Sequence, residues 1–142
     1  MKEVVSGVII RKGSVFLTQR KHDQTYPFKF ETPGGKVKLM EETPRQALAR
    51  ELFEEIDFGG EPELIIAPEP FFVADFELNE GRPPGPVKIS FYLVTIPDDC
   101  WPTGAEGQGS LWASIAEMRS LRLAPGNMRA AALIEREMVR LR

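Results

Sequence analysis

Three glutamates between residues 50 and 56 have the side-chain type and the spacing of a metal site. Glu51, Glu54 and Glu55 stand at positions i, i+3 and i+4, which share one face of an α-helix. Three carboxylates held close together repel one another, and a divalent cation would remove that cost. Oxygen ligands alone suit a hard cation such as Mg²⁺ or Mn²⁺. The same pattern also fits a solvated acidic helix face, because glutamate is a common surface residue with good helix propensity.

The residues just before this helix favour the metal site over the solvated face. Pro33-Gly34-Gly35-Lys36 precedes the helix by a short loop. Paired glycines let backbone groups approach a ligand closely, and Lys36 can meet a phosphate as a point charge. Taken alone, the segment indicates a turn. Joined to the three carboxylates at this distance, it predicts one assembled site for a phosphate compound and its cation.

These two segments resemble the signature of the Nudix hydrolases. That signature reads glycine, five residues, glutamate, seven residues, Arg-Glu, an aliphatic, any residue, Glu-Glu, any residue, glycine and an aliphatic. Here Gly35 and Glu42 are followed by Arg50-Glu51-Leu52-Phe53-Glu54-Glu55-Ile56-Asp57-Phe58, so the arginine and all four glutamates are present. Six residues, rather than five, separate Gly35 from Glu42, and Asp57 replaces the last glycine. Neither departure touches a ligand, so activity remains the expectation.

The resemblance implies an α/β fold of the α+β kind, an α/β/α sandwich with a mixed sheet. It also implies Mg²⁺-dependent (or Mn²⁺-dependent) hydrolysis of a phosphoanhydride next to a nucleoside. Arg50 would brace the carboxylates by ion pairing, and Glu42 would orient them. The residues implied to bind the cations are the Gly35 carbonyl, Glu51, Glu54 and Glu55.

Three further segments look closest to the MutT-like nucleoside triphosphate pyrophosphohydrolases. Residues 29–36 are similar to that branch's approach to the signature. Glu106-Gly107-Gln108, followed by Trp112, resembles a late loop whose glutamate reaches the metal as ligand or base. Pro125-Gly126-Asn127 resembles the place where an asparagine reads a purine edge, since its amide offers a donor and an acceptor.

Each of these late matches has a plainer interpretation, and both remain open. Glu106 fits a polar loop residue, and Asn127 fits an N-cap of the last helix. Arg20, at the end of a strand, fits a phosphate ligand or a surface arginine.

The aromatic residues, the histidine and the cysteine are less informative about the site. Phe72, Phe91 and Tyr92 could stack on a base, but core packing is the favoured interpretation for them. Trp112 is also expected in the core. No role is assigned to His22 or Cys100.

Several segments have the β-branched or alternating character of strands, and they form the frame that must hold the site. The expected strands are 4–10, 15–19, 28–31, 64–76 with a break near Pro68 and Pro70, and 87–96. The turn signal Lys12-Gly13-Ser14 joins the first two as a hairpin. The third should stop at Pro33-Gly34-Gly35, and the segments 79–86 and 97–110, rich in turn formers, predict loops.

The helices have clear start signals. Thr43 is a good N-cap, Pro44 suits the first helical position and Gln46 completes a capping box, which predicts a helix that ends near Ile56. Residues 114–118 predict a short helix. Residues 127–140 predict a closing helix whose expected core positions are Ala131, Leu133, Ile134, Met138 and Val139. Strands separated by two substantial helices predict a mixed sheet between helical layers.

Length and composition bound the class of protein. The 142 residues, 42% hydrophobic and 27% charged, predict a single domain over 1–142. No apolar stretch approaches the roughly 20 residues of a membrane span, so we expect a cytoplasmic protein. One cysteine excludes an intrachain disulfide. A net charge of −3 argues against a nucleic-acid polymer as partner, whereas a small nucleotide can arrive with its own cations. Monomer and homodimer both stay open.

Two alternatives to a MutT-like enzyme are kept. The same helix would serve a Nudix hydrolase of another nucleoside diphosphate derivative, such as ADP-ribose, a nucleotide sugar or a dinucleoside polyphosphate, or of a pyrimidine triphosphate. A non-catalytic, regulatory Nudix domain that binds a nucleotide is the second alternative, and the complete set of glutamates argues against it.

Overall fold

The fold is described from a computed structural model that covers residues 2–24, 27–78, 85–105, 108–123 and 125–140. Its strands are β1 (Lys2–Arg11), β2 (Ser14–Gln19), β3 (Phe30–Glu31), β4 (Gly34–Lys36), β5 (Ile56–Asp57), β6 (Ile65–Ile66), β7 (Phe72–Leu78), β8 (Gly85–Thr95), β9 (Thr103–Gly104) and β10 (Ser110–Ser114). Its helices are α1 (Pro44–Glu55), α2 (Ile115–Ser120) and α3 (Pro125–Arg140). No helix among the described residues has the length and apolar character needed to cross a membrane.

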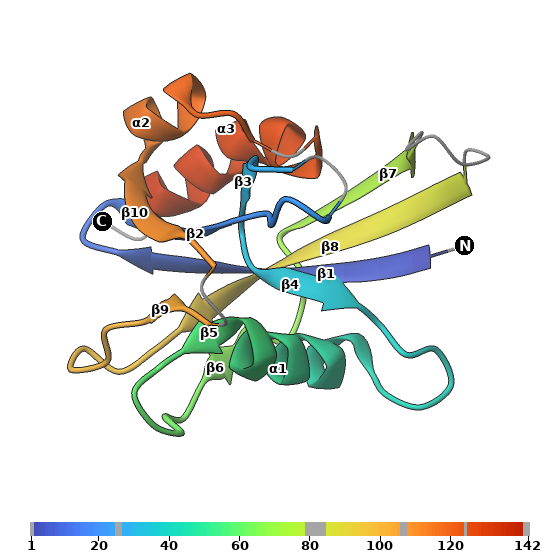
Figure 1. Cartoon of the computed structure of the whole chain (residues 1–142), viewed down its shortest axis with the longest axis horizontal. Coiled ribbons are helices and arrows are strands. Elements are labelled where there is room, and N and C mark those ends of the chain that lie inside the picture. Colours follow the sequence, from blue (N-terminus) through green and yellow to red (C-terminus); the bar gives the residue numbers. More distant parts are fainter. Residues whose placement is uncertain (1, 25–26, 79–84, 106–107, 124, 141–142) are drawn as a thin grey trace.

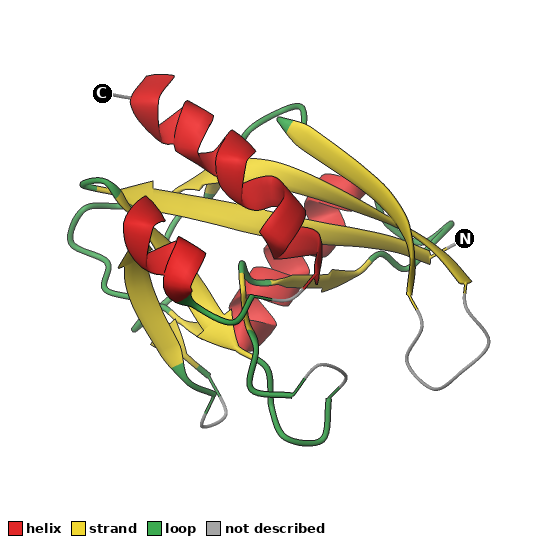
Figure 2. Cartoon of the chain, turned by 90° about the horizontal axis from the view of Figure 1, so that it is seen from above, coloured by secondary structure: helices red, strands yellow, loops and turns green. Residues whose placement is uncertain are grey.

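All of these strands except β5 and β9, which form a separate two-stranded sheet, make one mixed sheet between two helical layers, as expected. The main path runs β10-β2-β1-β8-β6, with β3 on β2, β4 on β1 and β7 on β8. β1 and β8 are parallel, from Lys2 beside Val87 to Ile9 beside Val94, and the other pairs in this sheet are antiparallel. Helix α1 lies on one face, and α2 and α3 lie on the other (Figure 1). Figure 2 shows α3 extended over its face of the sheet.

The alternation of side chains along β1 explains the two layers. Val5 and Ile9 enter the core beneath α1, whereas Val8 enters the core beneath α2 and α3, as the period of two in a strand requires. Gly7 lies on the α1 side, where an added Cβ would stand 3.3 Å from the side chain of Leu52. The missing side chain thus lets α1 pack close to the central strand.

Helix α1 begins and ends as its sequence predicts. The Thr43 side chain accepts from the Gln46 N–H, the Gln46 side chain accepts from the Thr43 N–H, and Pro44 opens the first turn. The helix ends at Glu55, and Asp57 is extended within β5. The left-handed backbone comes two residues later at Gly59, with φ of 74°, and its N–H donates to the Asp57 carboxylate. Asp57 therefore meets no backbone strain.

Two short strands in segments that were predicted to be loops correct the sequence analysis. Gly34–Lys36 does not stop the sheet but forms β4, because its backbone pairs with Val4 to Ser6 of β1. Thr103–Gly104 within the predicted loop 97–110 forms β9 against Ile56–Asp57. Both pairings depend on a distant partner, so nothing in the local composition indicates them.

Other strands differ from the prediction in their bounds. The third strand holds only Phe30 and Glu31, since Phe28 is left-handed with φ of 63°. β8 begins at Gly85, and β10, which pairs with β2, was missed. The break at Pro68 and Pro70 is confirmed by the separate strands β6 and β7. Residues 79–84 of the other predicted loop lie outside the described residues.

The last helix starts two residues before the expected position, at Pro125. Ile134 and Met138 are buried, and Ala131 and Leu133 are partly buried. Val139 is 57% exposed, so its assignment to the core was wrong. Ala130, which is fully buried, takes a core place that the sequence analysis missed.

Replacing the N-cap of α1 should destabilise the protein without altering its core. We expect Thr43→Ala to lower the free energy of unfolding by about 1 kcal/mol, because the N–H of Gln46 loses its acceptor. Thermal unfolding should then shift down by about 2–4 °C. Thr43→Ser keeps the hydroxyl and should unfold like the wild type; equal losses in both variants would contradict a capping role.

Candidate active site

The centre of the candidate site is a close contact between β4 and α1. The Gly34 N–H donates to the Glu55 carboxylate at 3.1 Å. A Cβ placed on Gly35 would stand 2.3 Å from the carboxyl carbon of Glu51, and one on Gly34 would stand 1.9 Å from the Val5 carbonyl oxygen. Both glycines are therefore needed here for close approach. The structure thus brings together Gly35, Glu51 and Glu55 from the sequence-predicted set.

Arg50 organises the carboxylates around this contact. Its guanidinium donates to both oxygens of Glu42, at 2.7 and 3.1 Å, and to Glu51 at 2.9 Å. It also meets Glu54 at 3.3 Å and the Lys36 carbonyl at 3.1 Å. These bonds hold the pKa of Glu42 well below its usual range, at about 2. The Arg50 guanidinium thus offsets the negative charge of three carboxylates and links α1 to the end of β4.

Glu54 differs from its two neighbours. Its side chain is 57% exposed and is turned toward Arg50, whereas Glu51 is mostly covered. Among the described residues, no three acidic, histidine or cysteine side chains stand close enough to form a metal cluster as they are placed. The three glutamates share the helix face as predicted, but two of them lie along β4 and the third faces solvent.

Sequence reasoning missed a further carboxylate, Glu31, beside the helix. Glu31 pairs with Arg20 at 3.0 Å, and its negative charge contributes to the raised pKa of Glu55. Burial also raises the pKa of Glu31 itself. The available signal was its place three residues before Gly34 in the chain. Arg20, predicted to contact phosphate, is therefore already in contact with an acidic group of the site.

Burial of negative charge is the electrostatic feature that a cation would relieve. Burial, followed by the charges of Glu31 and Glu51, raises the pKa of Glu55 to about 8, although the Gly34 N–H lowers it. Burial also raises the pKa of Glu51. All nearby donors are oxygen atoms, and a Cβ at Gly35 would fill the space beside the Glu51 carboxylate. The residues therefore fit a hard divalent cation.

The residues on either side of Glu106-Gly107, Ala105 and Gln108, connect this loop to the C-terminal end of α1 and to the end of β2. The Ala105 N–H donates to the Glu55 carbonyl oxygen at 2.8 Å. On the other side, the Gln108 amide donates to the Gln19 carbonyl oxygen at 2.9 Å. Glu106, predicted to be a catalytic and metal residue, lies outside the described residues.

Asn127 lies on the opposite side of the segment that carries Glu31. It sits within the first turn of α3, so the N-cap interpretation was wrong. Its Oδ1 accepts from the N–H of Thr32 at 2.9 Å and from the Thr32 hydroxyl at 2.8 Å. Thr32 lies in the short connection between β3 and β4, two residues from Gly34, so Asn127 lies beside the segment that leads into the carboxylate site.

The loop that is one residue longer than the Nudix signature is absorbed in a turn. The N–H groups of Glu41 and Glu42 donate to the Lys38 carbonyl, and the Lys38 N–H donates to the Glu42 carboxylate. Met40 takes the left-handed conformation, with φ of 69°, and is fully exposed. Glu42 still reaches Arg50, so the extra residue leaves this ion pair intact.

The remaining candidates are placed as follows. Lys36 is exposed beside the site, and His22 is exposed in a loop. Phe91 is fully buried and stacks on Phe72, which agrees with core packing. Cys100 is buried, and burial raises the pKa of its thiol.

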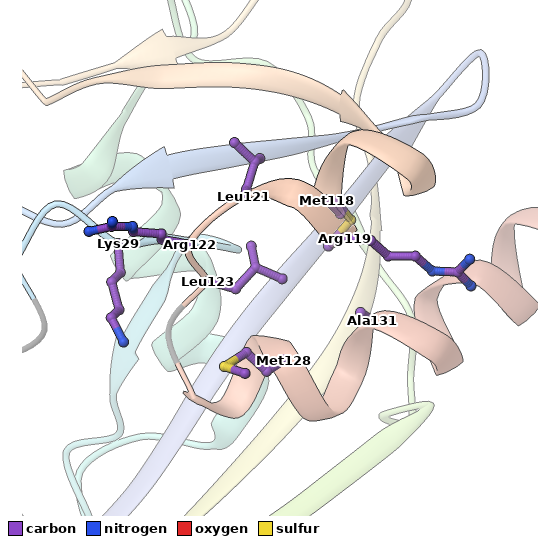
Figure 3. A pocket seen from close by; sticks show the side chains of 8 residues that line it. All are labelled: Lys29, Met118, Arg119, Leu121, Arg122, Leu123, Met128 and Ala131. Carbon is purple, nitrogen blue, oxygen red and sulfur yellow. The ribbon is translucent and has the colours of Figure 1, made fainter.

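Tyr92 and Trp112 also agree with core packing. Tyr92 is buried in the core beneath α1, and Trp112 packs against that core. A separate groove of about 570 Å³ contains none of the predicted site residues (Figure 3). It is lined by Lys29, Met118, Arg119, Leu121, Arg122, Leu123, Met128 and Ala131.

Comparisons with known proteins agree with the fold and with the signature. The NUDIX domain family matches this chain over residues 1–136. An 8-oxo-dGTP diphosphatase of Haemophilus influenzae is 35% identical over 138 residues, which cover 94% of this chain and 89% of the relative. The CTP pyrophosphohydrolase of Escherichia coli is 30% identical, covering 90% and 87%. The solution structure of MutT from Staphylococcus aureus aligns with a TM-score of 0.70 at 29% identity, covering 96% of both chains.

Filling the space at Gly35 should disturb cation binding more than stability. In Gly35→Ala the new methyl group would meet the Glu51 carboxylate, which must then turn away. We expect Mg²⁺ affinity, measured by calorimetry, to fall about tenfold or more. Gly60→Ala is the matched control, since a Cβ there meets nothing within 4 Å. Unchanged Mg²⁺ affinity in Gly35→Ala would exclude Glu51 as a ligand.

Burial of Glu55 should make the metal-free protein less stable as pH rises. Its folded pKa of about 8 exceeds the ordinary value of 4.5. The folded state therefore binds more protons than the unfolded state between these values, and stability falls with rising pH across that window. We expect Glu55→Gln, in EDTA at pH 8, to be more stable than the wild type by on the order of 2 kcal/mol. Thermal melts from pH 5 to 8 measure this. A variant less stable than wild type at pH 8 would contradict it.

Proposed function

Since the chain belongs to the Nudix family of pyrophosphohydrolases, we propose that it hydrolyses a nucleoside triphosphate with Mg²⁺ to a nucleoside monophosphate and pyrophosphate. The observation that supports the proposal most is the contact of Gly34 and Gly35 with the carboxylates of Glu55 and Glu51. It gathers buried acidic groups beside an accessible backbone, where a cation and a phosphate can meet.

The residues proposed to hold the cation are the Gly35 carbonyl, Glu51, Glu54, Glu55 and Glu106. When bound, Mg²⁺ or Mn²⁺ screens the phosphate charge and lowers the pKa of a coordinated water. Arg50 keeps Glu51 and Glu54 oriented through its ion pairs. Arg20 and Lys36 are proposed to contact the phosphates, Arg20 beside Glu31 and Lys36 at the exposed end of β4.

A carboxylate must take the proton of the attacking water. As the oxygen of water bonds to phosphorus, the bridging P–O bond breaks, its electrons leave with the departing phosphate fragment, and the proton passes to the base. Among the described glutamates proposed to hold the cation, Glu54 has a side chain open to solvent, with 57% exposed, so it can meet a water without rearrangement. We assign it as the general base on this ground.

The base of the substrate is proposed to be a purine, with oxidised guanine as the first candidate. Asn127 lies beside the segment that leads into the site, and the relative from Haemophilus influenzae is named for 8-oxo-dGTP. A pyrimidine triphosphate is the second candidate, because another relative is a CTP pyrophosphohydrolase. The partner in either case is a small nucleotide.

Turnover of a defined panel tests the proposal. The panel holds dGTP, 8-oxo-dGTP, CTP, ADP-ribose and a diadenosine polyphosphate, each incubated with Mg²⁺. The wild type should hydrolyse at least one of the triphosphates to a nucleoside monophosphate and pyrophosphate. Glu54→Gln should lower kcat about 10²- to 10⁴-fold, as expected on removal of a general base. Glu63→Gln, a change at an exposed glutamate outside the site, should leave kcat unchanged.

Three results would contradict parts of the proposal. Cleavage of only ADP-ribose or the dinucleotide would keep the Nudix reaction and exclude the triphosphate substrate. Full activity in Glu54→Gln would exclude this residue as base. Nucleotide binding without any turnover would support a regulatory domain instead.

A further inference from the structure

A groove on the α2 and α3 side of the sheet has a buried apolar floor and lies outside the proposed active site (Figure 3). Met118 of α2 and Leu123 form the floor and are 0% and 5% exposed, whereas Met128 of α3 stands at the edge and is 63% exposed. The groove has a volume of about 570 Å³. Small-molecule sites in proteins measure roughly 300 to 1,000 Å³ and are mostly apolar. The groove therefore has the size and the surface of a site for a small ligand.

A backbone contact brings two cationic side chains together at one end of this groove. The Phe30 N–H donates to the Arg122 carbonyl oxygen at 2.7 Å, and Phe30 also pairs with Leu123 in an isolated parallel bridge. Lys29, the neighbour of Phe30, therefore lies beside Arg122, and Figure 3 shows both side chains at the same end of the groove. An anion bound between these two cations would offset their mutual repulsion.

Arg119 marks the other end of the groove. Its guanidinium forms an ion pair with the Glu135 carboxylate, which joins α2 to α3 at that point. In Figure 3, the Arg119 side chain points away from Lys29 and Arg122. An extended peptide that ran along the groove would meet this ion pair, whereas a compact ligand would not. The described contacts therefore favour a small molecule over a peptide as the occupant.

The charge of the groove contrasts with that of the whole chain. The chain has a net charge of −3, yet the described residues that line the groove include three cations and no carboxylate. Glu135 already offsets the charge of Arg119. Within the described part of the chain, the Arg122 guanidinium has no ion-pair partner, and a guanidinium can hold a carboxylate through two parallel N–H donors. The groove is therefore complementary to a ligand that carries a negative charge.

We propose that this groove is a second ligand site, which takes a small organic anion with an apolar body. The anionic group would accept from the Arg122 guanidinium, with Lys29 beside it. The hydrocarbon or aromatic body would pack against Met118, Leu123 and Met128. Methionine side chains suit this role, because they are flexible and adapt to the shape of an apolar surface. The proposal is separate from the proposed function, since it requires neither the carboxylates of the active site nor a cation.

Displacement of a fluorescent probe measures binding at the groove. Anilinonaphthalene sulfonate is an aromatic anion whose fluorescence rises in apolar surroundings, and it should bind the folded protein saturably at a single site. Decanoate, an anion with an apolar chain, should displace the probe. Decyltrimethylammonium, which has a chain of the same length and a positive charge, should not displace it at equal concentration. The absence of saturable probe binding, or equal displacement by both competitors, would overturn the proposal.

Two substitutions in the groove, each with a matched control, should change the affinity for the probe. Arg122→Gln removes the cation and should lower this affinity about tenfold, the effect of losing a hydrogen bond to a charged group. Arg136→Gln, at an exposed position of α3 outside the groove, should leave it unchanged. Met128→Glu places a carboxylate at the exposed edge and should lower the affinity at least as much, whereas Met128→Leu keeps the apolar contact and should bind as the wild type does. Wild-type affinity in both Arg122→Gln and Met128→Glu would overturn the proposal.

Binding measured without turnover separates this proposal from the proposed function. The probe should bind equally well in EDTA and with Mg²⁺, and in Glu54→Gln as in the wild type, because none of the described carboxylates of the active site lines the groove. Changes in amide chemical shifts on addition of decanoate should centre on Leu123 and Met128. Changes centred on Gly35 and Glu51, or loss of binding in EDTA, would place the ligand in the active site and overturn the proposal. A protein that hydrolyses no nucleotide but still binds the probe in the groove would contradict the proposed function and support the second site.

Discussion

The close approach of β4 to α1 is the contact on which the site depends. A Cβ on Gly34 would stand 1.9 Å from the Val5 carbonyl oxygen, and one on Gly35 would meet the Glu51 carboxylate, which would have to turn away. Pairing of β4 with β1 fixes the strand, and Leu52 packed over Gly7 fixes the helix. The backbone that carries Glu51 and Glu55 is therefore fixed by the core on both sides, which lowers the cost of ordering these groups around a ligand.

This contact concentrates negative charge in a partly buried place. Glu31, Glu51 and Glu55 all have raised pKa values, with burial as the first cause. Arg50 and Arg20 offset part of that charge through ion pairs. Burial of these carboxylates disfavours their charged forms, and a divalent cation bound beside them would offset that cost.

The segment 31–35 connects the two faces of the sheet. Glu31 faces α1 and affects Glu55, whereas Thr32 faces α3 and bonds Asn127. Gly34 and Gly35 then return to the carboxylates. This short segment therefore contacts α3 on one face of the sheet and α1 on the other.

Local sequence patterns determined the helix with its capping box, the hairpin and the shared face of the glutamates. Each depends on neighbours a few residues apart, where periodicity and cap chemistry act directly. The strands β4, β9 and β10, the contact of Glu31 with the site and the bond from Thr32 to Asn127 were decided only by the tertiary structure. They join residues far apart in the chain, as with Thr32 and Asn127, which are 95 positions apart. Such pairings depend on how the whole sheet is assembled, and no local propensity encodes them.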